Sequence, residues 1–355
     1  MYKTEEIFKK LPYEIDCALI TSAENRRYFT GMRSSAGTVV CFRENAYLII
    51  DFRYIEKARA TVKSCEVIEQ DSIYKQIEEL VQKHGAKKIA VEADKMTISE
   101  LNSYKKKLSE CEFDTSDSLS KAISKMRIIK DKLEIEKISQ AQGIAEKAFE
   151  HILDFIQVGR TEREIELELN WAMLKSGAEA ISFDSIVLSG KNTSMPHGVP
   201  SEKKVEYGEF VLMDFGAVID GYHSDMTRTV CVGKPSAEME EVYSIVLKAQ
   251  ENALKSARAG IRGKDLDTSA RRIIEDAGFG DAFGHSLGHG VGLDIHEMPS
   301  ASHISEILLK KNMFVTIEPG IYLPEKFGVR IEDLVVITEE SCINLNKTSK
   351  KLICI

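Results

Sequence analysis

Apolar positions follow two different periods along the chain, and each period predicts one type of element. Short apolar runs at residues 14–70, in EIDCALI, GTVVCF and AYLIIDF, are typical of β-strands. Helical spacing follows at 72–84 and 97–108, with the strand-like run KKIAVEA between them. This first part of the chain therefore predicts a smaller α/β domain.

Helices with clear start and stop signals dominate the next part of the chain. Apolar residues recur at helical spacing from Leu133 to Phe155, and this pattern ends near Gly159. Thr161 and Glu164 form a capping box for another helix. Further helices are expected at 237–259 and 264–277.

Strand-like runs separate these later helices, at 182–188, 209–216, 225–232, 286–295, 313–318 and 329–338. Runs of strands between helices predict an antiparallel sheet with helices segregated onto one face, which is an α+β layout. We place the domain boundary after residue 127, so that the domains are expected at 1–127 and 128–355.

Composition and charge narrow the range of partners. The chain has 355 residues, 43% hydrophobic and 29% charged, as expected for a soluble globular protein of about two domains. A net charge of −8 argues against nucleic acid as a partner. No apolar run approaches the roughly 20 residues of a membrane span. The seven cysteines are scattered without a CxxC motif, which favours reduced thiols and a cytoplasmic location.

Two stretches of the chain are nearly the same. FVLMDFG at 210–216 and FVTIEPG at 314–320 each end a strand-like run with a carboxylate, Asp214 or Glu318. A second carboxylate follows each, Asp225 or Glu332, and the repeats are offset by 104 (318 − 214) and 107 (332 − 225) residues. Hairpins would let the carboxylates of each repeat face each other. Four converging carboxylates would repel each other or take up protons unless a cation held them.

Three of the eight histidines lie between the repeats, in GHSLGHGVGLDIHE at 284–297: His285, His289 and His296. The glycines suggest a phosphate-binding loop, but no Lys-Ser/Thr follows and the run does not lead from a strand into a helix. Histidine is a common metal ligand and acid–base group, so this stretch is expected to join the acidic cluster. His197, between Pro196 and Gly198, is a further candidate on a loop.

These residues resemble the pita-bread metallopeptidases, a group that includes proline-specific dipeptidases and aminopeptidases, methionine aminopeptidases and creatinase. The motifs SGxNxxxPHG, MDFGxxxxGYxSDMTRT, HxLGHGVGLDxHExP, TIEPGIY and RIED carry the resemblance over essentially the whole chain. It implies a creatinase-type N-terminal domain at 1–127 and a pita-bread catalytic domain at 128–355, in which a pseudo-two-fold antiparallel sheet has helices on one face.

The resemblance also implies a dinuclear metal centre. Its five ligands would be Asp214, Asp225, His289, Glu318 and Glu332, with Asp225 and Glu332 bridging the two ions. Such an oxygen-rich set suits Mn²⁺, which we expect, as well as Co²⁺, Fe²⁺ or Zn²⁺. A hydroxide bridging the ions would attack the scissile carbonyl.

Roles for the remaining candidates follow from the same resemblance. Glu318 would shuttle a proton, and His296 would stabilise the oxyanion. His197 would contact the substrate and His285 would shape the proline pocket, while Arg330, also expected to bind substrate, would orient a bridging carboxylate. His197, His296 and Glu318 are thus the expected catalytic residues.

The leading hypothesis is an Xaa-Pro aminopeptidase that acts on small peptides with proline at the second position. An Xaa-Pro dipeptidase (prolidase) is the alternative, for which Arg33, Arg53 and Arg330 are candidate anchors of a free carboxylate. A metal-free creatinase-like or binding protein would have lost the ligand residues, and a methionine aminopeptidase would lack the N-terminal domain. The resemblance further implies a homodimer.

Overall fold

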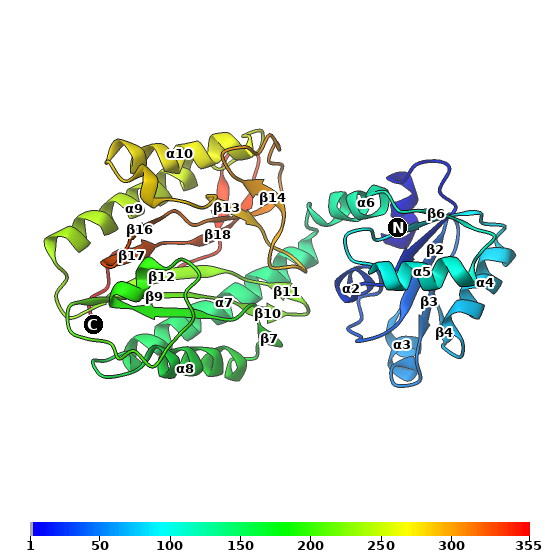
Figure 1. Ribbon diagram of the computed structural model, residues 1–355, viewed down its shortest axis with the longest axis horizontal. Coiled ribbons are helices and arrows are strands. Elements are labelled where there is room, and N and C mark those ends of the chain that lie inside the picture. Colours follow the sequence, from blue (N-terminus) through cyan, green and yellow to red (C-terminus); the bar gives the residue numbers. More distant parts are fainter. Residues whose placement is uncertain (1–2) are drawn as a thin grey trace. The chain divides into compact units, whose positions relative to one another are not determined.

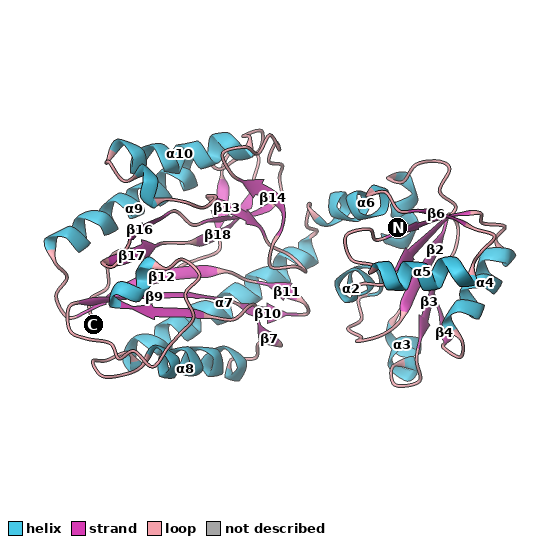
Figure 2. Ribbon diagram, in the orientation of Figure 1, coloured by secondary structure: helices cyan, strands magenta, loops and turns pink. Residues whose placement is uncertain are grey.

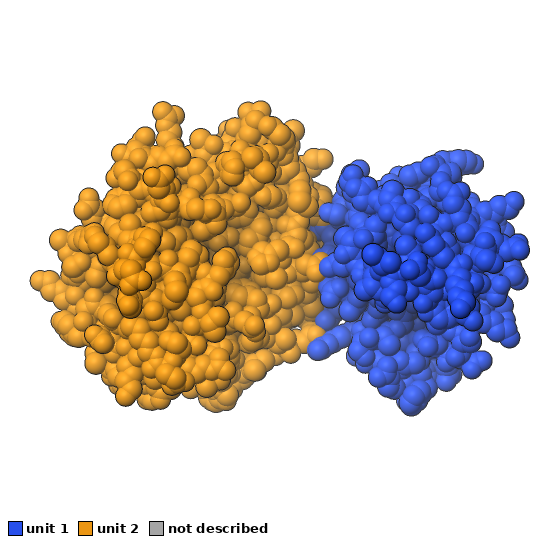
Figure 3. Space-filling view, viewed as in Figure 1, with its two compact units in different colours: residues 1–127 blue, residues 128–355 orange. Residues whose placement is uncertain are grey.

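The computed structural model describes residues 3–355 and divides into two compact units, Met1–Arg127 and Ile128–Ile355 (Figure 3). No helix among residues 3–355 combines the length and apolar character needed to cross a bilayer. All seven cysteines have free thiols.

The first unit is built on a six-stranded mixed sheet in the order β4-β3-β2-β1-β5-β6 (Figure 1). Strand β1 runs antiparallel to β2 and parallel to β5. The strands are β1 (Cys17–Ile20), β2 (Thr38–Phe42), β3 (Ala46–Ile50), β4 (Glu66–Glu69), β5 (Lys88–Val91) and β6 (Glu112–Asp114). The helices are α1 (Lys3–Glu6), η1 (Ile7–Lys9), α2 (Ala23–Thr30), α3 (Ile55–Thr61), α4 (Ile73–Lys83), α5 (Ile98–Lys107) and α6 (Ser118–Arg127).

Apolar periodicity explains these elements. Every residue of β1 is buried, and Ile77, Leu80 and Val81 of α4 pack into the same core as Leu19 of that strand. Spacings of three and four residues place the α4 side chains on one face of the helix. The expected α/β character of this unit is confirmed.

The second unit consists of two halves with similar element order. The first half contains α7 (Lys132–Phe155), α8 (Glu162–Lys175), β7 (Ala180–Ile181), β8 (Ile186–Ser189), η2 (Gly190–Ser194), β9 (Glu209–Phe215), β10 (Ala217–Ile219), β11 (Tyr222–His223) and β12 (Met226–Val232). The second half contains α9 (Ala237–Ser256), α10 (Gly263–Asp276), η3 (Gly280–Ala282), β13 (Gly288–Gly290), β14 (Glu297–Ala301), β15 (Phe314–Ile317), β16 (Gly320–Leu323), β17 (Phe327–Arg330), β18 (Asp333–Ile337) and β19 (Cys342–Asn344).

One long β-ribbon forms the centre of each half. In the first ribbon β9 pairs with β12 and β10 with β11, and in the second β15 pairs with β18 and β16 with β17. Helices α7 and α8 pack on the first half and α9 and α10 on the second, each pair enclosing its own apolar core (Figure 2). The α+β layout expected from the runs of strands between helices is therefore confirmed.

The turn of each ribbon fixes its register. Asp220 and Gly221, both at positive φ (48° and 79°), make the two-residue tip of the first ribbon. Positive φ at both central positions is the mark of a type I′ turn, which matches the twist of paired strands. The second ribbon has a three-residue tip, in which Glu325 has a φ of 59°.

A seam joins the two ribbons. The amide of Glu332 donates to the carbonyl of Thr227 at 3.1 Å, and the Thr229 hydroxyl donates to the carbonyl of Arg330 at 3.0 Å. Strand β12 therefore lies beside the segment between β17 and β18. The acidic residues at the ends of both ribbons come together along this seam.

The expectation of a strand at 286–295 is wrong for most of its length. Only Gly288–Gly290 pairs with β14, and the chain then turns through residues 291–296. A Cβ on Gly292 would lie 2.4 Å from the Glu297 carboxylate, so the backbone here is packed against a side chain instead of a neighbouring strand.

Helix α7 also departs from its apolar pattern. Leu133 is 66% exposed, whereas Glu134, Gln142 and Glu146 face the protein interior. These polar side chains are buried because each accepts a hydrogen bond there: Glu134 from Tyr222 Oη (2.8 Å), Gln142 from the Asp225 amide (3.3 Å) and Glu146 from the Thr348 amide (2.7 Å). Apolar spacing alone cannot identify such positions.

Candidate metal centre

The two ribbons bring their carboxylates to the seam with different registers. In the first ribbon Asp214 lies opposite Thr227, so Asp225 lies opposite Gly216, two positions further along. The expectation that Asp214 and Asp225 face each other directly is therefore wrong, because the two-residue turn sets another register. In the second ribbon Ile317 lies opposite Asp333, and the next step of the ladder brings Glu318 opposite Glu332.

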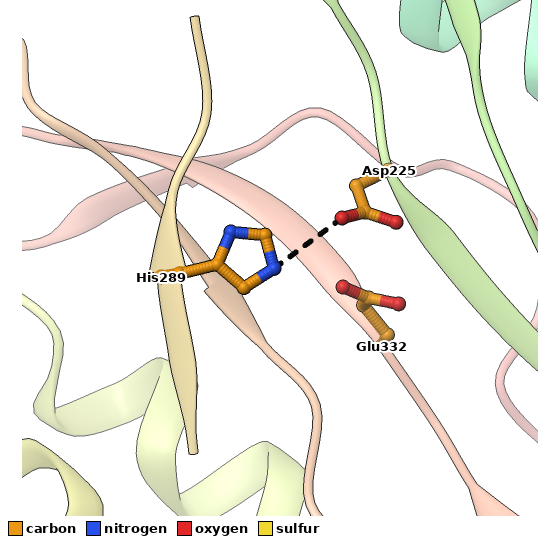
Figure 4. A group of neighbouring side chains, drawn as sticks. All are labelled: Asp225, His289 and Glu332. Atoms are coloured by element: carbon orange, nitrogen blue, oxygen red, sulfur yellow. Dashed lines mark ion pairs between the residues drawn. The ribbon is translucent and has the colours of Figure 1, made fainter. Parts of the chain in front are cut away.

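His289 reaches this cluster from β13. Its amide donates to the Thr316 hydroxyl at 3.0 Å, which holds β13 against β15. His289 Nε2 lies 3.5 Å from both Asp225 Oδ2 and Glu318 Oε1. Asp225, His289 and Glu332 each present one potential ligand atom, and these three atoms lie within 4.8 Å of one another (Figure 4).

The protonation of His289 suits a metal ligand. Its Nδ1 lies 3.1 Å from the carbonyl oxygen of Gly290, which can only accept, so Nδ1 carries the hydrogen. Burial, followed by the neighbouring His296, lowers the pKa of His289 to about 4, so the ring is neutral. The lone pair of Nε2 then points at carboxylate oxygens. A cation between them would turn this repulsion into coordination.

The pKa values and hydrogen bonds of the carboxylates also fit a metal site. Burial raises the pKa of Glu318 to about 8, and burial together with neighbouring carboxylates raises the pKa of Asp225 and Glu332 well above the ordinary range. Asp214 Oδ1 is buried and has no hydrogen-bond partner. Buried, crowded carboxylate oxygens with an unused acceptor fit divalent cations, and four carboxylates would balance two of them.

Arg330 organises one side of the cluster. Its guanidinium donates to Asp214 Oδ2 (2.6 Å), Thr227 Oγ1 (3.0 Å), Tyr322 Oη (2.8 Å) and the carbonyl of Pro196 (3.4 Å). Thr227 in turn donates to Glu332 at 2.7 Å. Arg330 thus touches Asp214 directly and reaches Glu332 only through Thr227.

A pocket of about 540 Å³ opens onto these groups, within the usual range for small-molecule sites. Nine of the residues expected from the sequence line it: Asp214, Asp225, His289, Glu318, Glu332, His197, His285, His296 and Arg330. The candidate anchors Arg33 and Arg53 are not among the lining residues. Phe183, Ile186, Pro196 and Ile295 add apolar wall. The pocket therefore places apolar walls beside the acidic cluster.

The three other histidines occupy different places in this pocket. His296 lies beside His289, with ring centroids 4.3 Å apart, and His197 is exposed at the surface of its loop. His285 Nδ1 donates to the Ser286 carbonyl at 2.8 Å, and Nε2 therefore accepts from Tyr322 Oη at 2.9 Å. Burial lowers the pKa of His285 to about 4, with Arg330 as the next cause.

Several supporting residues were not identified from the sequence. Tyr322 links Arg330 to His285, and the hydroxyls of Thr227 and Thr316 orient Glu332 and Glu318. Each lies within two or four residues of a carboxylate in the repeated motifs, and this proximity was the one available signal. Asp184 also lines the pocket and had no signal of its own.

The sequence matches two known protein families along most of its length. Residues 136–339 match metallopeptidase family M24, and residues 9–129 match the creatinase/prolidase N-terminal domain.

Individual relatives match nearly the whole chain. An Xaa-Pro dipeptidase from Pyrococcus horikoshii is 40% identical, over 96% of this chain and 95% of the relative. The solved structure of an Xaa-Pro dipeptidase from Bacillus anthracis is 40% identical, with a TM-score of 0.96 and 99% of each chain covered. An X-Pro aminopeptidase structure from Thermotoga maritima is 39% identical, with a TM-score of 0.91, over 96% of this chain and 98% of that one.

Proposed function

The chain belongs to metallopeptidase family M24, and from this premise we propose that it hydrolyses Xaa-Pro dipeptides. The two dipeptidase relatives described above support this reaction, and the protein is a proline-specific metallopeptidase in either version of the hypothesis. The aminopeptidase, which was the leading hypothesis from the sequence, has less support from these relatives than the dipeptidase alternative. The single observation that carries the catalytic proposal is the convergence of four carboxylates and a neutral imidazole in one pocket.

The residues at the seam would hold two divalent cations. Asp214, Asp225, His289, Glu318 and Glu332 offer oxygen and imidazole donors, and we propose Mn²⁺ as the ion, with Co²⁺, Fe²⁺ or Zn²⁺ as alternatives. When bound, such ions supply Lewis acidity and lower the pKa of water.

Glu318 is suited to move the proton. The leaving group is the nitrogen of proline, which carries no hydrogen in the peptide and must gain one when the bond breaks. The Glu318 carboxylate lines the pocket beside the other ligands, where it could take a proton from water and donate it to this nitrogen. The Thr316 hydroxyl donates to Glu318 Oε1 at 3.1 Å and fixes its orientation.

The histidines would bind and orient the peptide. His296 is proposed to hydrogen-bond the oxygen of the scissile carbonyl as charge develops on it. His197 is proposed to contact the substrate near proline, and His285, held by Tyr322, to shape the wall that faces the ring. The free carboxylate of a dipeptide would have to be bound by imidazole N–H groups of His197 or His296.

One observation favours the aminopeptidase as a second candidate. Among the described residues that line the pocket, Arg330 is the one arginine or lysine, and its guanidinium already donates to four acceptors. A dipeptide carboxylate would therefore have no free guanidinium or ammonium group in this pocket. A longer peptide, whose proline carbonyl is uncharged, has no such need.

Hydrolysis of Ala-Pro, Ala-Pro-Ala and the control Ala-Ala, with Mn²⁺ and Co²⁺ in turn, tests the proposal. We expect turnover of Ala-Pro, little or no turnover of Ala-Ala, and loss of activity with EDTA. Preference for Ala-Pro-Ala would replace the dipeptidase by the aminopeptidase. Equal rates on Ala-Ala, or activity insensitive to chelation, would contradict the proposal in both versions.

A further inference from the structure

Glu162, at the start of α8, is a buried carboxylate outside the pocket. It is fully inaccessible to solvent, and its two oxygens accept five hydrogen bonds. Oε1 accepts from the amide (2.6 Å) and hydroxyl (3.1 Å) of Ser189 and from Asn192 Nδ2 (3.0 Å). Oε2 accepts from the amide (3.0 Å) and hydroxyl (2.6 Å) of Ser201. In the described part of the chain no lysine or arginine forms an ion pair with Glu162.

All five donors belong to one stretch, residues 189–201, which we call the substrate loop. Pro196 and His197, near its middle, line the catalytic pocket, and Glu162 does not. The carboxylate holds both ends of the substrate loop, Ser189 on one side and Ser201 on the other. It therefore closes the base of the loop from a separate element, the first turn of α8.

The body of the substrate loop is also closely packed. A Cβ on Gly190 would lie 2.1 Å from Glu209 Oε1, and a Cβ on Gly198 would lie 2.7 Å from the side chain of Leu188. The Thr193 hydroxyl accepts from the amide of Gly328 at 2.7 Å. A loop fixed at its base and along its length holds His197 in a defined position.

A carboxylate satisfies this set of donors, and an amide does not. A carboxylate is purely an acceptor, whereas a glutamine side chain presents an NH₂ group at one of the two positions. That NH₂ would face the donors of Ser189 or Ser201 in a buried place, where unpaired donors are costly. Charge-assisted hydrogen bonds to backbone amides are also stronger than neutral ones.

We propose that Glu162 is a positioning residue for substrate binding, which acts through the substrate loop and His197. The proposal rests on the proposed function, because it assigns His197 to the peptide. In the described part of the chain Glu162 makes no hydrogen bond to any of the five proposed cation ligands, which lie on the two ribbons and on β13. The substrate loop contacts Arg330 through the carbonyl of Pro196 at 3.4 Å, the longest of the four hydrogen bonds of that guanidinium. Loss of the Glu162 carboxylate should therefore weaken substrate binding much more than cation binding.

The test compares Glu162→Gln with Glu164→Gln, a matched control in the same helical turn. The Glu164 carboxylate accepts from the Thr161 amide at 2.8 Å and pairs with Arg160 at 3.6 Å, and neither contact involves the substrate loop. On Ala-Pro, Glu162→Gln should raise KM about tenfold and change kcat less than about twofold, with an unchanged Kd for Mn²⁺. Glu164→Gln should leave KM unchanged.

A double-mutant cycle identifies the route of the effect. If Glu162 acts through His197, Glu162→Gln added to His197→Ala should raise KM by less than about twofold further. Fully additive effects on KM, or an equal loss of kcat and Mn²⁺ affinity in Glu162→Gln, would overturn the proposal. If Glu162→Gln fails to fold, Ser201→Ala is the second variant. It removes the 2.6 Å hydroxyl bond to Glu162, together with a 3.2 Å bond from the Lys203 amide, and should raise KM about threefold; an unchanged KM would count against the proposal.

Hydrogen exchange separates this proposal from the proposed function. A wild-type protein inactive on both Ala-Pro and Ala-Pro-Ala would reject the proposed function. The amides of residues 189–201 should still exchange faster in Glu162→Gln than in Glu164→Gln. Equal exchange in the two variants would reject the role of Glu162 in fixing the substrate loop.

Discussion

His289 is prepared for coordination by its neighbours. The hydrogen bond from Nδ1 to the Gly290 carbonyl leaves Nε2 as an acceptor that faces Asp225 and Glu318 at 3.5 Å. The neutral state is maintained by burial, since the pKa is about 4. A ligand fixed in the correct tautomer loses little freedom when a cation binds.

At the residue scale, Asp225→Asn is expected to lower kcat on Ala-Pro at least about 100-fold, because an amide is a poorer ligand than a carboxylate for the divalent cations that Asp225 is proposed to hold. The protein should remain folded, since the change removes one charge from a crowded cluster. Steady-state kinetics and the Tm in EDTA check both parts. Asp276→Asn, on the exposed end of α10, is the control and should have no effect. Retained activity in Asp225→Asn would contradict the ligand assignment.

Arg330→Lys is expected to weaken Mn²⁺ binding by about 10- to 100-fold, although the charge is kept. A single ammonium group cannot reach Asp214, Thr227, Tyr322 and Pro196 together, as the planar guanidinium does. Isothermal titration with Mn²⁺ measures the effect. Arg272→Lys, on the exposed face of α10, should bind Mn²⁺ as the wild type does, and equal affinities in the two variants would argue against the role of Arg330.

At the scale of elements, the internal repeat predicted the two ribbons, whereas the register of their strands could not be predicted. FVLMDFG and FVTIEPG correctly predicted two ribbons and the meeting of their carboxylates. The sequence could not give the pairing of Asp214 with Thr227, because register depends on a turn whose length is not visible in the apolar pattern. The expectation of a strand at 286–295 is wrong for most of this stretch, because its glycines have no side chains whose alternation could distinguish a strand from a turn. These glycines instead allow close packing of the backbone against neighbouring groups.

Gly288 shows this packing clearly. A Cβ there would lie 1.9 Å from the carbonyl oxygen of Thr316, so Gly288→Ala must push β13 away from β15 and move His289. We expect a loss of about 1–3 kcal/mol in stability and about 100-fold in kcat, measured by urea unfolding and by hydrolysis of Ala-Pro. Gly284→Ala is the matched control, since nothing lies within 4 Å of its Cβ. Similar behaviour of the two variants would show that β13 tolerates displacement.

At the scale of the whole molecule, the acidic cluster should link stability to pH and metal. The folded pKa of Glu318, about 8, lies above its value in the unfolded chain, so the chelated protein binds extra protons when folded. The stability from this group is complete below the unfolded pKa and is lost as pH rises through about 8. In EDTA the Tm should fall between about pH 5 and about pH 8, and saturating Mn²⁺ should reduce the fall. Calorimetry checks this, and a chelated protein equally stable across that range would contradict it.

The division into two domains could be predicted from the sequence, whereas some of the interior of the second domain could not. The change from strand alternation to long helical patterns indicated two architectures, because each has its own apolar period. The buried polar face of α7 could not be predicted, since Gln142 and Glu146 are buried only by virtue of partners distant in sequence. The homodimer implied by the resemblance stays a prediction.

The seam between the two ribbons has one further consequence. The first ribbon brings Asp214 and Asp225, while His289, Glu318 and Glu332 come from the other half. A shorter protein made of a single half would possess only part of this constellation and would have to associate with an identical copy about a symmetry axis to complete it. Fusion of two such halves into one gene would remove that concentration dependence. It would also free each copy to diverge, so that one could gain an imidazole that the other never had.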